Sequence, residues 1–460
     1  MVMDADPRST GEGGGRRVTD AAHDRRVGAV AETVRALVGA RGPVHIDKGG
    51  VHHVVPLASG DSRFTGRRID VSTLRHVLEV DVERRLCVAE PGVTFRAVVD
   101  ATLRHGLVPA VVPELEGITL GGAVAGCSVE SSSFRYGGFH DSCLDYEVVT
   151  GTGEVLGCSP EHEPLVFGMI HGSYGTLAIL TRVRFALVAA KPYVHVEYRR
   201  FRDPASLHAA MLARCEAADV DFIDGIVHAP DHWTLCLGRF VERARRASSY
   251  RWLDVYYKST RVLDEDVLTT PDYFFRYDTE AHWLSRTVPP LEWKPVRFLL
   301  GRLFLGSTNM IRWSGRLRPI FRLKRRPDVV CDYFIPAGRV PEFYDWYLRE
   351  LRYFPLWVVP YRVPKPYPWL SAGHRARAGD LYVDLAVYGM PNGDPGVDRS
   401  EQLEEKTYEL GGLKTLISRN HYSAERFWSI YDEATVRQVK ARLDPRGMFR
   451  DLYEKLHRVG

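Results

Sequence analysis

The sequence has little that would tie it to a membrane, a disulfide framework or a nucleic acid. No apolar run reaches eighteen residues, roughly the length a helix needs to cross a bilayer. Seven cysteines form no Cys-x-x-Cys pair and no metal-ligand spacing, so we expect reduced thiols and no metal site. The 62 basic and 58 acidic residues nearly cancel, leaving a net charge of +4. This balance gives no support to nucleic-acid binding.

Lysine is scarce as well. Only ten of the 62 basic residues are lysine, a bias typical of a GC-rich genome, which we interpret as bacterial. Residues 1–20 contain the Gly11–Gly15 cluster and no hydrophobic stretch, which predicts a disordered N-terminus and not a signal peptide. We therefore expect a cytoplasmic protein. The length of 460 residues with 45% hydrophobic and 26% charged residues predicts two or three globular domains.

The pattern along the chain predicts an α+β protein. Residues 21–192 begin with helical apolar spacing over Asp24–Val38. They continue with short strands, one of them over Val51–Val55, and with glycine turns, and they end in a strong strand over Leu177–Ala186. They lack the strand–Gly-x-Gly-x-x-Gly–helix unit of a Rossmann domain. Residues 193–391 predict strand–helix–strand units with antiparallel partners, including a helix over Pro204–Ala217. Within them, residues 243–326 are dense in Arg, Trp and Tyr, and we predict a linker there. Residues 392–460 predict a mostly helical C-terminal segment.

Three glycine-bearing loops carry the chemical signal. Pro113–Gly137 contains five glycines and three consecutive serines, and the other loops are Asp47–His53 and His171–Leu177. Glycine lets the backbone approach a flat ligand or a pyrophosphate, and successive N–H groups can bind an anion. Tight structural turns would have the same composition, so the loops alone leave both interpretations open.

The sequence resembles flavoproteins of the FAD-binding PCMH type, which have the vanillyl-alcohol oxidase/p-cresol methylhydroxylase fold, and most closely the Δ24-sterol reductase (seladin/diminuto) family. The resemblance spans roughly Val44 to Leu456. It is carried by Leu78–Asp81, Val88–Pro91, Val111–Leu115, Thr119–Gly122, Val129–Gly137, Phe354–Trp357, Asp380–Asp384 with Tyr388-Gly389, and Arg426–Trp428. It implies an FAD-binding domain of two subdomains over residues 21–192, a substrate-capping domain over 193–391, and a segment over 392–460 that returns to the FAD domain.

The resemblance implies non-covalently bound FAD as cofactor. Carried over by position, the cofactor-binding residues are Lys48, Gly49, Gly50, Val51, His52, His53, Pro113, Glu114, Leu115, Thr119, Gly121, Gly122, Ala125, Gly126, Val129, Glu130, Ser131, Ala178 and Ile179. The loop KGGVHHVV lacks the glycine-x-glycine-histidine/serine pattern that is usual in this fold. A covalent bond from His52 or His53 to the flavin stays open as an alternative.

Flavin catalysis requires a donor near N1/O2 of the ring and a group that moves a proton. The resemblance offers Arg419 first and His421 second for the N1/O2 position. For the proton it offers several candidates, which are Arg276, Tyr277, His282, Tyr382, Tyr388 and Glu130. Trp357, Trp369, Tyr361 and Tyr367 are candidates for the wall of an apolar substrate tunnel, although packing within the second domain would use the same residue types.

Three functions follow from the resemblance. The first is an FAD-dependent reductase that uses NADPH to reduce a C=C bond in an apolar, isoprenoid-like or natural-product substrate. The second is an FAD-dependent oxidase or dehydrogenase of an alcohol or sugar carbon, with O2 or another acceptor. The third is a flavin-binding protein without turnover. The sequence leaves the substrate, the electron donor and the oligomeric state open.

Overall fold

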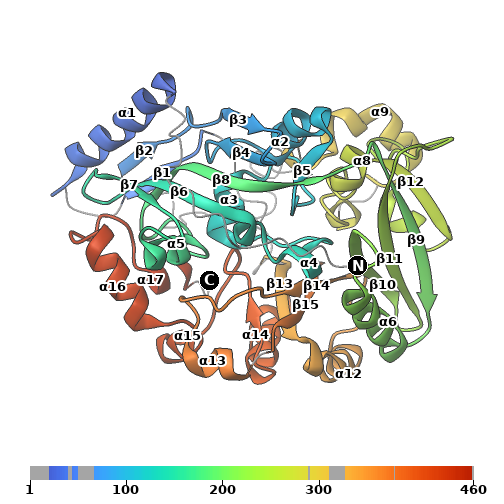
Figure 1. Ribbon diagram of the computed structural model, residues 1–460. Coiled ribbons are helices and arrows are strands. Elements are labelled where there is room, and N and C mark those ends of the chain that lie inside the picture. Colours follow the sequence, from blue (N-terminus) through green and yellow to red (C-terminus); the bar gives the residue numbers. More distant parts are fainter. Residues whose placement is uncertain are drawn as a thin grey trace.

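The computed structural model describes residues 20–39, 44–49, 67–287, 291–309, 327–377 and 379–457. Within them the chain forms two large sheets and a small parallel pair (Figure 1). The first large sheet lies in the N-terminal part of the chain, and the second is built from strands after residue 192.

The first sheet has six strands in the order β3-β4-β8-β6-β7, with β5 paired to β8. The strands β1 and β2 form the separate parallel pair. The strands of this half are β1 Val44–Asp47, β2 Arg67–Asp70, β3 Val77–Asp81, β4 Leu86–Ala89, β5 Leu107–Pro109, β6 Cys143–Val149, β7 Val155–Cys158 and β8 Ile179–Ala189. Its helices are α1 Ala21–Leu37, α2 Phe95–Thr102, α3 Leu120–Gly126, α4 Ser133–Tyr136 and α5 Pro164–Ile170, with 3₁₀ turns η2 Leu103–His105 and η3 Phe139–Ser142.

The second sheet has eight strands in the order β12-β9-β11-β10-β14-β15-β13-β16, and every pair in it is antiparallel. Its strands are β9 Tyr193–Phe201, β10 Phe222–Ala229, β11 His232–Val241, β12 Glu265–Thr269, β13 Val329–Pro336, β14 Leu356–Arg362, β15 Leu381–Met390 and β16 Leu413–Lys414. The accompanying helices are α6 Pro204–Ala217, α7 Tyr256–Ser259, α8 Thr270–Phe274, α9 Lys294–Phe304, α12 Val340–Glu350, α13 Ala372–Arg377 and α14 Arg399–Glu409, with 3₁₀ turns η4 Leu284–Thr287 and η5 Ala337–Arg339.

The two faces of the second sheet pack against different partners. Along β15, Val383, Leu385 and Val387 join the core formed with α6 and α12. The alternating residues Ala386 and Tyr388 join the core shared with the first sheet. Because side chains alternate across a strand, one face of the second sheet is turned toward the first half of the chain, and this face positions the candidate site.

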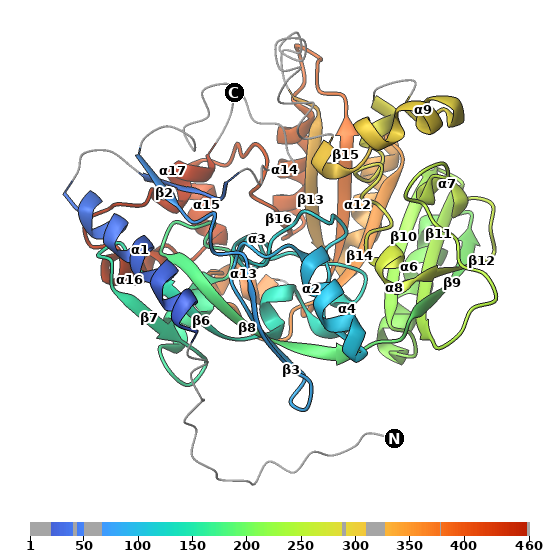
Figure 2. The same cartoon turned by 90° about the horizontal axis from the view of Figure 1, so that it is seen from above.

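The C-terminal helices lie against the first half (Figures 1 and 2). They are α15 Ala424–Ile430, α16 Glu433–Leu443 and α17 Leu452–Leu456. Lys440 of α16 pairs with Asp444 and donates a hydrogen bond of 2.8 Å to the carbonyl oxygen of Thr176. This contact ties the end of the chain to the loop that precedes β8.

The α+β class expected from the sequence is correct, and α6 begins and ends as expected. The expected strand over residues 51–55 lies outside the described residues. The prediction of a linker over residues 243–326 was wrong for its described part, because that part contains α7, β12, α8 and α9. The alternation of apolar and polar residues is weak in this part of the sequence, because its helices and strand are short and are packed from several sides.

Candidate functional site

The glycine-rich segment Pro113–Gly137 forms a tightly packed turn at the edge of the first sheet. Gly121 donates its N–H to the carbonyl of Pro91 at 2.8 Å, and a Cβ at Gly121 would lie 2.7 Å from the Pro91 Cβ. The Thr119 hydroxyl caps α3 by accepting from the N–H of Gly122. Glycine at position 121 is therefore required by the close approach of two backbone segments.

The glycine loop His171–Leu177 packs against this segment. Gly172 has a φ of +64°, and a Cβ there would lie 3.4 Å from the Cys127 sulfur. Tyr174 donates its N–H to the carbonyl of Ala125 at 3.2 Å. A Cβ at Gly175 would lie 3.2 Å from the Cδ1 of Ile46. Ile46 belongs to β1, which leads into the loop Asp47–His53. The loop His171–Leu177 is thus in contact with the segment Pro113–Gly137, and β1, which leads into the loop Asp47–His53, lies beside Gly175.

Buried polar groups beside these loops lack partners. The two ring nitrogens of His171 and the Nδ1 of His140 have no hydrogen-bond partner among the described residues. The two rings lie 5.0 Å apart, and burial lowers the pKa of both, well below the usual value for His171. Because unpaired buried polar atoms are costly, they indicate a place for a ligand with polar groups.

Opposite the glycine-rich segment, the second sheet presents an unusual set of acidic side chains. Asp224 of β10, Asp332 of β13 and Asp384 of β15 are in register with residues of the shared core on the same face. Asp224 and Asp384 are 0% and 1% exposed. Buried carboxylates on the face between two domains are expensive unless they are paired or protonated.

Arg276 ties the two sides of this interface together. Its guanidinium lies 3.0 Å from Asp224 and 3.3 Å from Glu130 of the glycine-rich segment. Tyr277 and Trp357 donate further hydrogen bonds to the same Asp224 oxygen, at 3.0 and 2.9 Å. Arg276 is fully buried in this arrangement.

A second buried group surrounds His282. Its Nε2 lies 2.9 Å from Glu114, and its ring lies 4.5 Å from that of Tyr388 and 4.6 Å from that of Tyr277. Tyr388 in turn donates its hydroxyl to Asp332. The Nδ1 of His282 has no hydrogen-bond partner among the described residues, so this nitrogen is available to a bound molecule.

Burial changes the protonation of the carboxyls at this interface. It raises the pKa of Glu130 to about 7, an effect that Arg276 opposes and Asp224 reinforces. Burial also raises the pKa of Asp332 and, well above the usual range, that of Asp384. By itself burial would raise the pKa of Glu114 too, but the hydrogen bond from His282 holds it below its usual value. The site therefore combines the ionised carboxylate of Glu114 with the carboxyl of Glu130, which is able to carry a proton near neutral pH.

The structure brings several sequence candidates together and separates others. Glu130, Arg276, Tyr277, His282 and Tyr388 all lie at this interface. Tyr382 is buried on the same face of β15 as Asp384, and it is in register with Tyr361 of β14. Among the loop candidates, Lys48 and Gly49 are exposed, and Gly50, Val51, His52 and His53 lie outside the described residues.

The structure does not bring Arg419 and His421 together with the other candidates. Arg419 pairs with Asp398 at 2.6 Å, and the Nδ1 of His421 lies 3.0 Å from Glu404 of α14. Lys414 completes this cluster by donating to Glu404 and to the carbonyl of Arg419. Lys414 is in register with Tyr333, which belongs to the core on the α6 and α12 side of the sheet. Both side chains thus have local structural partners.

Sequence reasoning missed the carboxyls of the sheet. It named neither Asp224 nor Asp332, and it took Asp384 only as part of a family motif. The signal that marks all three is a single acidic residue within an apolar strand, as in Phe222–Ile226. Such a residue is rarely buried unless its carboxyl has a specific partner.

Comparison with known proteins identifies an FAD-binding domain in this half of the chain. Residues 25–159 match the family model of an FAD binding domain. The matched range includes the glycine-rich segment and its contact with Pro91. The residues present fit that cofactor, because the segments Pro113–Gly137 and His171–Leu177 pack together beside buried polar atoms that have no hydrogen-bond partner in the described part of the chain.

The whole chain is similar to curated reductases. It is 24% identical over 416 residues to the Delta(24)-sterol reductase of Homo sapiens, covering 87% of this chain and 80% of the relative. The Delta(24)-sterol reductases of Pisum sativum and Arabidopsis thaliana are 22% and 23% identical over 429 and 428 residues, with 84% of this chain and 76% of each relative covered. The protein is an FAD-dependent oxidoreductase.

The similarity of this flavoprotein to its relatives does not settle the organism from which it comes. The relatives named here come from an animal and two plants, so the bacterial origin inferred from arginine usage stays a prediction. Within the described ranges no helix combines the length and the apolar character that a membrane crossing requires.

Proposed function

We propose that this flavoprotein reduces a C=C bond in an apolar, isoprenoid-like or natural-product substrate, with NADPH as the electron donor. When bound, FAD supplies hydride transfer through N5. The observation that carries the direction of reduction is the buried carboxyl of Glu130, which lies beside Arg276 and whose pKa of about 7 leaves it about half protonated at neutrality and mostly protonated below it. A reduced double bond needs one proton beside the hydride, and Glu130 is placed to hold it.

The chain's own residues divide the remaining work. In this proposal FAD is held non-covalently by Lys48, Gly49, Pro113, Glu114, Leu115, Thr119, Gly121, Gly122, Ala125, Gly126, Val129, Glu130, Ser131, Ala178 and Ile179. Arg276 orients Glu130 through their 3.3 Å contact. Trp357, Tyr361 and Tyr382, on the buried face of β14 and β15, form an apolar wall for the substrate. The names of the relatives, Delta(24)-sterol reductases, support an apolar substrate.

A second candidate function is the oxidation of an alcohol or sugar carbon, with O2 or another acceptor. It is favoured by the Glu114–His282 pair, because the carboxylate orients Nε2 and leaves the buried Nδ1 without a partner. Such a nitrogen can accept the proton of a substrate hydroxyl while hydride leaves the same carbon.

Chemically reduced enzyme distinguishes the two functions. The flavin is reduced by dithionite under argon, excess reductant is removed, and a panel of apolar alkenes is added. We expect the yellow colour to return together with a product that carries two additional hydrogens. If no alkene restores the colour, while alcohols or sugars bleach the oxidised enzyme, the reductase proposal is wrong and the oxidase function is correct.

A further inference from the structure

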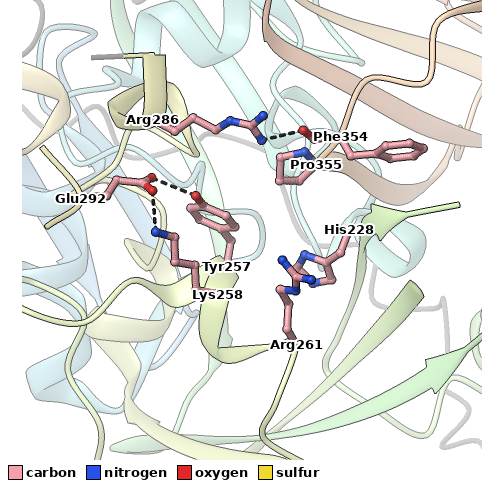
Figure 3. A pocket seen from close by; sticks show the side chains of 8 residues that line it. All are labelled: His228, Tyr257, Lys258, Arg261, Arg286, Glu292, Phe354 and Pro355. Atoms are coloured by element: carbon pink, nitrogen blue, oxygen red, sulfur yellow. Dashed lines mark hydrogen bonds and ion pairs between the residues drawn. The ribbon is translucent and has the colours of Figure 1, made fainter. Parts of the chain in front are cut away.

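A pocket of about 310 Å³ lies outside the carboxyl-rich interface, between the second sheet and the segment that carries α7 and α9. Figure 3 shows its side chains converging from several elements. They are His228 at the end of β10, Tyr257 and Lys258 of α7, Arg261 after that helix, Arg286 of η4, Glu292 before α9, and Phe354 and Pro355 before β14. The volume is at the lower end of the range for small-molecule sites.

Positive charge dominates the lining. Lys258 is balanced by Glu292 at 2.6 Å, and Arg286 donates to the carbonyl of Phe354 at 2.5 Å, which fixes its position. Arg261 forms no ion pair with any described residue. Two guanidinium groups therefore face the cavity with a single carboxylate, already shared by Lys258 and the Tyr257 hydroxyl.

The floor of the pocket is a buried neutral histidine. The Thr260 hydroxyl donates to the carbonyl of Tyr257 at 2.9 Å, so its oxygen accepts the Nε2 proton of His228 at 3.0 Å. Burial, with the nearby His232 and Arg261, lowers the pKa of His228 to about 3. The His228 side chain is 9% exposed and has a fixed tautomer, so it forms a rigid wall behind the exposed side chains of Arg261 and Arg286.

One aromatic layer separates this pocket from the candidate active site. The ring of Tyr257 contacts Trp283 edge-on, with the centroids 5.8 Å apart. Trp283 donates its indole N–H to the carbonyl of Tyr388 at 3.0 Å, and Tyr388 packs on His282. A molecule bound in the pocket would thus lie next to the layer that supports His282.

We propose that this pocket binds the phosphate group of a phosphorylated ligand, with Arg261 as its principal contact and Arg286 beside it. The planar guanidinium matches the geometry of phosphate oxygens and forms short charge-assisted hydrogen bonds to them. The excess of positive charge disfavours a metal ion or a cationic ligand. The phosphate site is independent of the direction of electron flow.

The phosphate has two chemical sources, a nicotinamide dinucleotide that delivers electrons or a substrate that carries a phosphate or diphosphate. Two phosphorylated probes distinguish them, 2′,5′-ADP for the dinucleotide and a short prenyl diphosphate for the substrate. Inhibition of NADPH-driven flavin reduction by 2′,5′-ADP assigns the site to the dinucleotide. Tighter binding of the prenyl diphosphate, without effect on flavin reduction, assigns it to the substrate.

Calorimetry with inorganic pyrophosphate tests the site itself, using the FAD-saturated protein so that the cofactor loops are occupied. We expect saturable binding that R261Q weakens about tenfold or more, as expected for loss of one charge-assisted contact. E292Q removes the one carboxylate of the pocket and is expected to tighten binding, a gain that misfolding cannot produce. R84Q, on the exposed turn between β3 and β4, is the matched control and should bind as the parent does.

Absence of pyrophosphate binding to the parent protein would overturn the proposal. So would equal affinities of the parent, R261Q and E292Q. If NADPH fails to reduce the flavin but pyrophosphate still binds through Arg261, the phosphate site stands while the proposed reductase function falls.

Discussion

At the scale of single residues, the chemistry of the site depends on one arginine buried among carboxyls. Arg276 has no exposed surface and contacts both Asp224 and Glu130. A buried ion pair is a weak source of net stability, but removal of one partner leaves an uncompensated charge. Arg276 is thus expected to decide both the stability of the interface and the protonation of Glu130.

Replacing Glu130 tests the proton donor. E130Q is expected to lower turnover about 100-fold or more, the usual contribution of a positioned acid, while NADPH still reduces the flavin. In the parent enzyme the protonated form of Glu130 is active, so the rate should fall as pH rises through about 7. Steady-state rates against pH check both expectations.

The control for Glu130 is E116Q. Glu116 lies in the same glycine-rich segment, but its carboxylate is partly exposed and pairs with Arg96. The E116Q variant should keep the pH profile of the parent. An unchanged turnover and pH profile in E130Q would remove Glu130 from the reaction.

Replacing Arg276 tests the interface. R276M leaves Asp224 and Glu130 without their cation and is expected to reduce the free energy of unfolding by about 3–5 kcal/mol. Urea denaturation followed by tryptophan fluorescence measures the loss. The control R84M removes an arginine whose side chain is 75% exposed and should change little. Equal losses in the two variants would contradict the role given to Arg276.

Some residues of the candidate site could be named from the sequence alone. It named Glu130, Arg276 and Tyr277 through a family resemblance, but it could not place Asp224 or Asp332. Their burial depends on which strands pair, a long-range property that no local spacing contains. The sequence also could not show the partners of Arg419. In the structure its side chain pairs with Asp398, and its carbonyl accepts a hydrogen bond from Lys414.

At the scale of elements, α1 is held to the first sheet by a buried charge network. His23 lies 2.8 Å from Glu90 and 3.1 Å from Glu147 of β6. Burial alone would lower the pKa of His23, but the hydrogen bonds to Glu147 and Glu90 raise it to about 9. Burial would raise the pKa of Glu90, yet its hydrogen bonds with His23, His76 and Arg26 lower it to about 2.

These shifts predict how the attachment of α1 depends on pH. The His23 contribution is complete below about pH 6.5 and is lost as pH rises through about 9. The Glu90 contribution is present above about pH 4.5 and is lost as pH falls through about 2. Both are present between about pH 4.5 and 6.5. From the upper end of this window to pH 9 and beyond, the loss from His23 approaches about 3 kcal/mol.

Hydrogen exchange of α1 at several pH values, compared between the parent and H23Q, measures this effect. We expect protection of α1 in the parent to fall between neutral pH and pH 9, and H23Q to lack that dependence. H105Q, at an exposed histidine after α2, should behave as the parent. A pH dependence that persists in H23Q would show that another group is responsible.

The glycine-rich turn is a second test at this scale. G121V would place a Cβ 2.7 Å from the Pro91 Cβ, so the turn must move and FAD occupancy should fall severalfold. Flavin absorbance per protein after desalting measures the occupancy. G157V on β7 has no atom within 4 Å of its added Cβ and should retain FAD. Equal occupancy in the two variants would argue against a cofactor role for this turn.

Elements with clear periodicity could be predicted, and those without it could not. The helix over α6 and the alternating strands β8 and β9 follow from apolar spacing and breaker residues. Strands β14 and β15 are buried along nearly their whole length, so their sequences lack the alternation of a half-exposed strand. The short elements α7, α8 and β12 depend on tertiary packing and give no clear local signal.

At the scale of the whole molecule, one continuous core joins the two sheets. It contains Ala89 and Phe185 of the first sheet together with Trp357 and Ala386 of the second. The carboxyls of the candidate site lie at this junction, so the geometry of the site depends on both halves of the chain. The fold class was accessible from the sequence, whereas this junction was not, because it is defined by contacts between distant segments.

The central claim is that electrons flow from a nicotinamide to the flavin and from there to a double bond. Anaerobic titration of the purified protein with NADPH, followed in the visible spectrum, tests it most directly. The account predicts that the two bands of oxidised flavin bleach with NADPH and return when an apolar alkene is added. Bands that persist with NADPH and NADH, but bleach with an alcohol or a sugar, would contradict it.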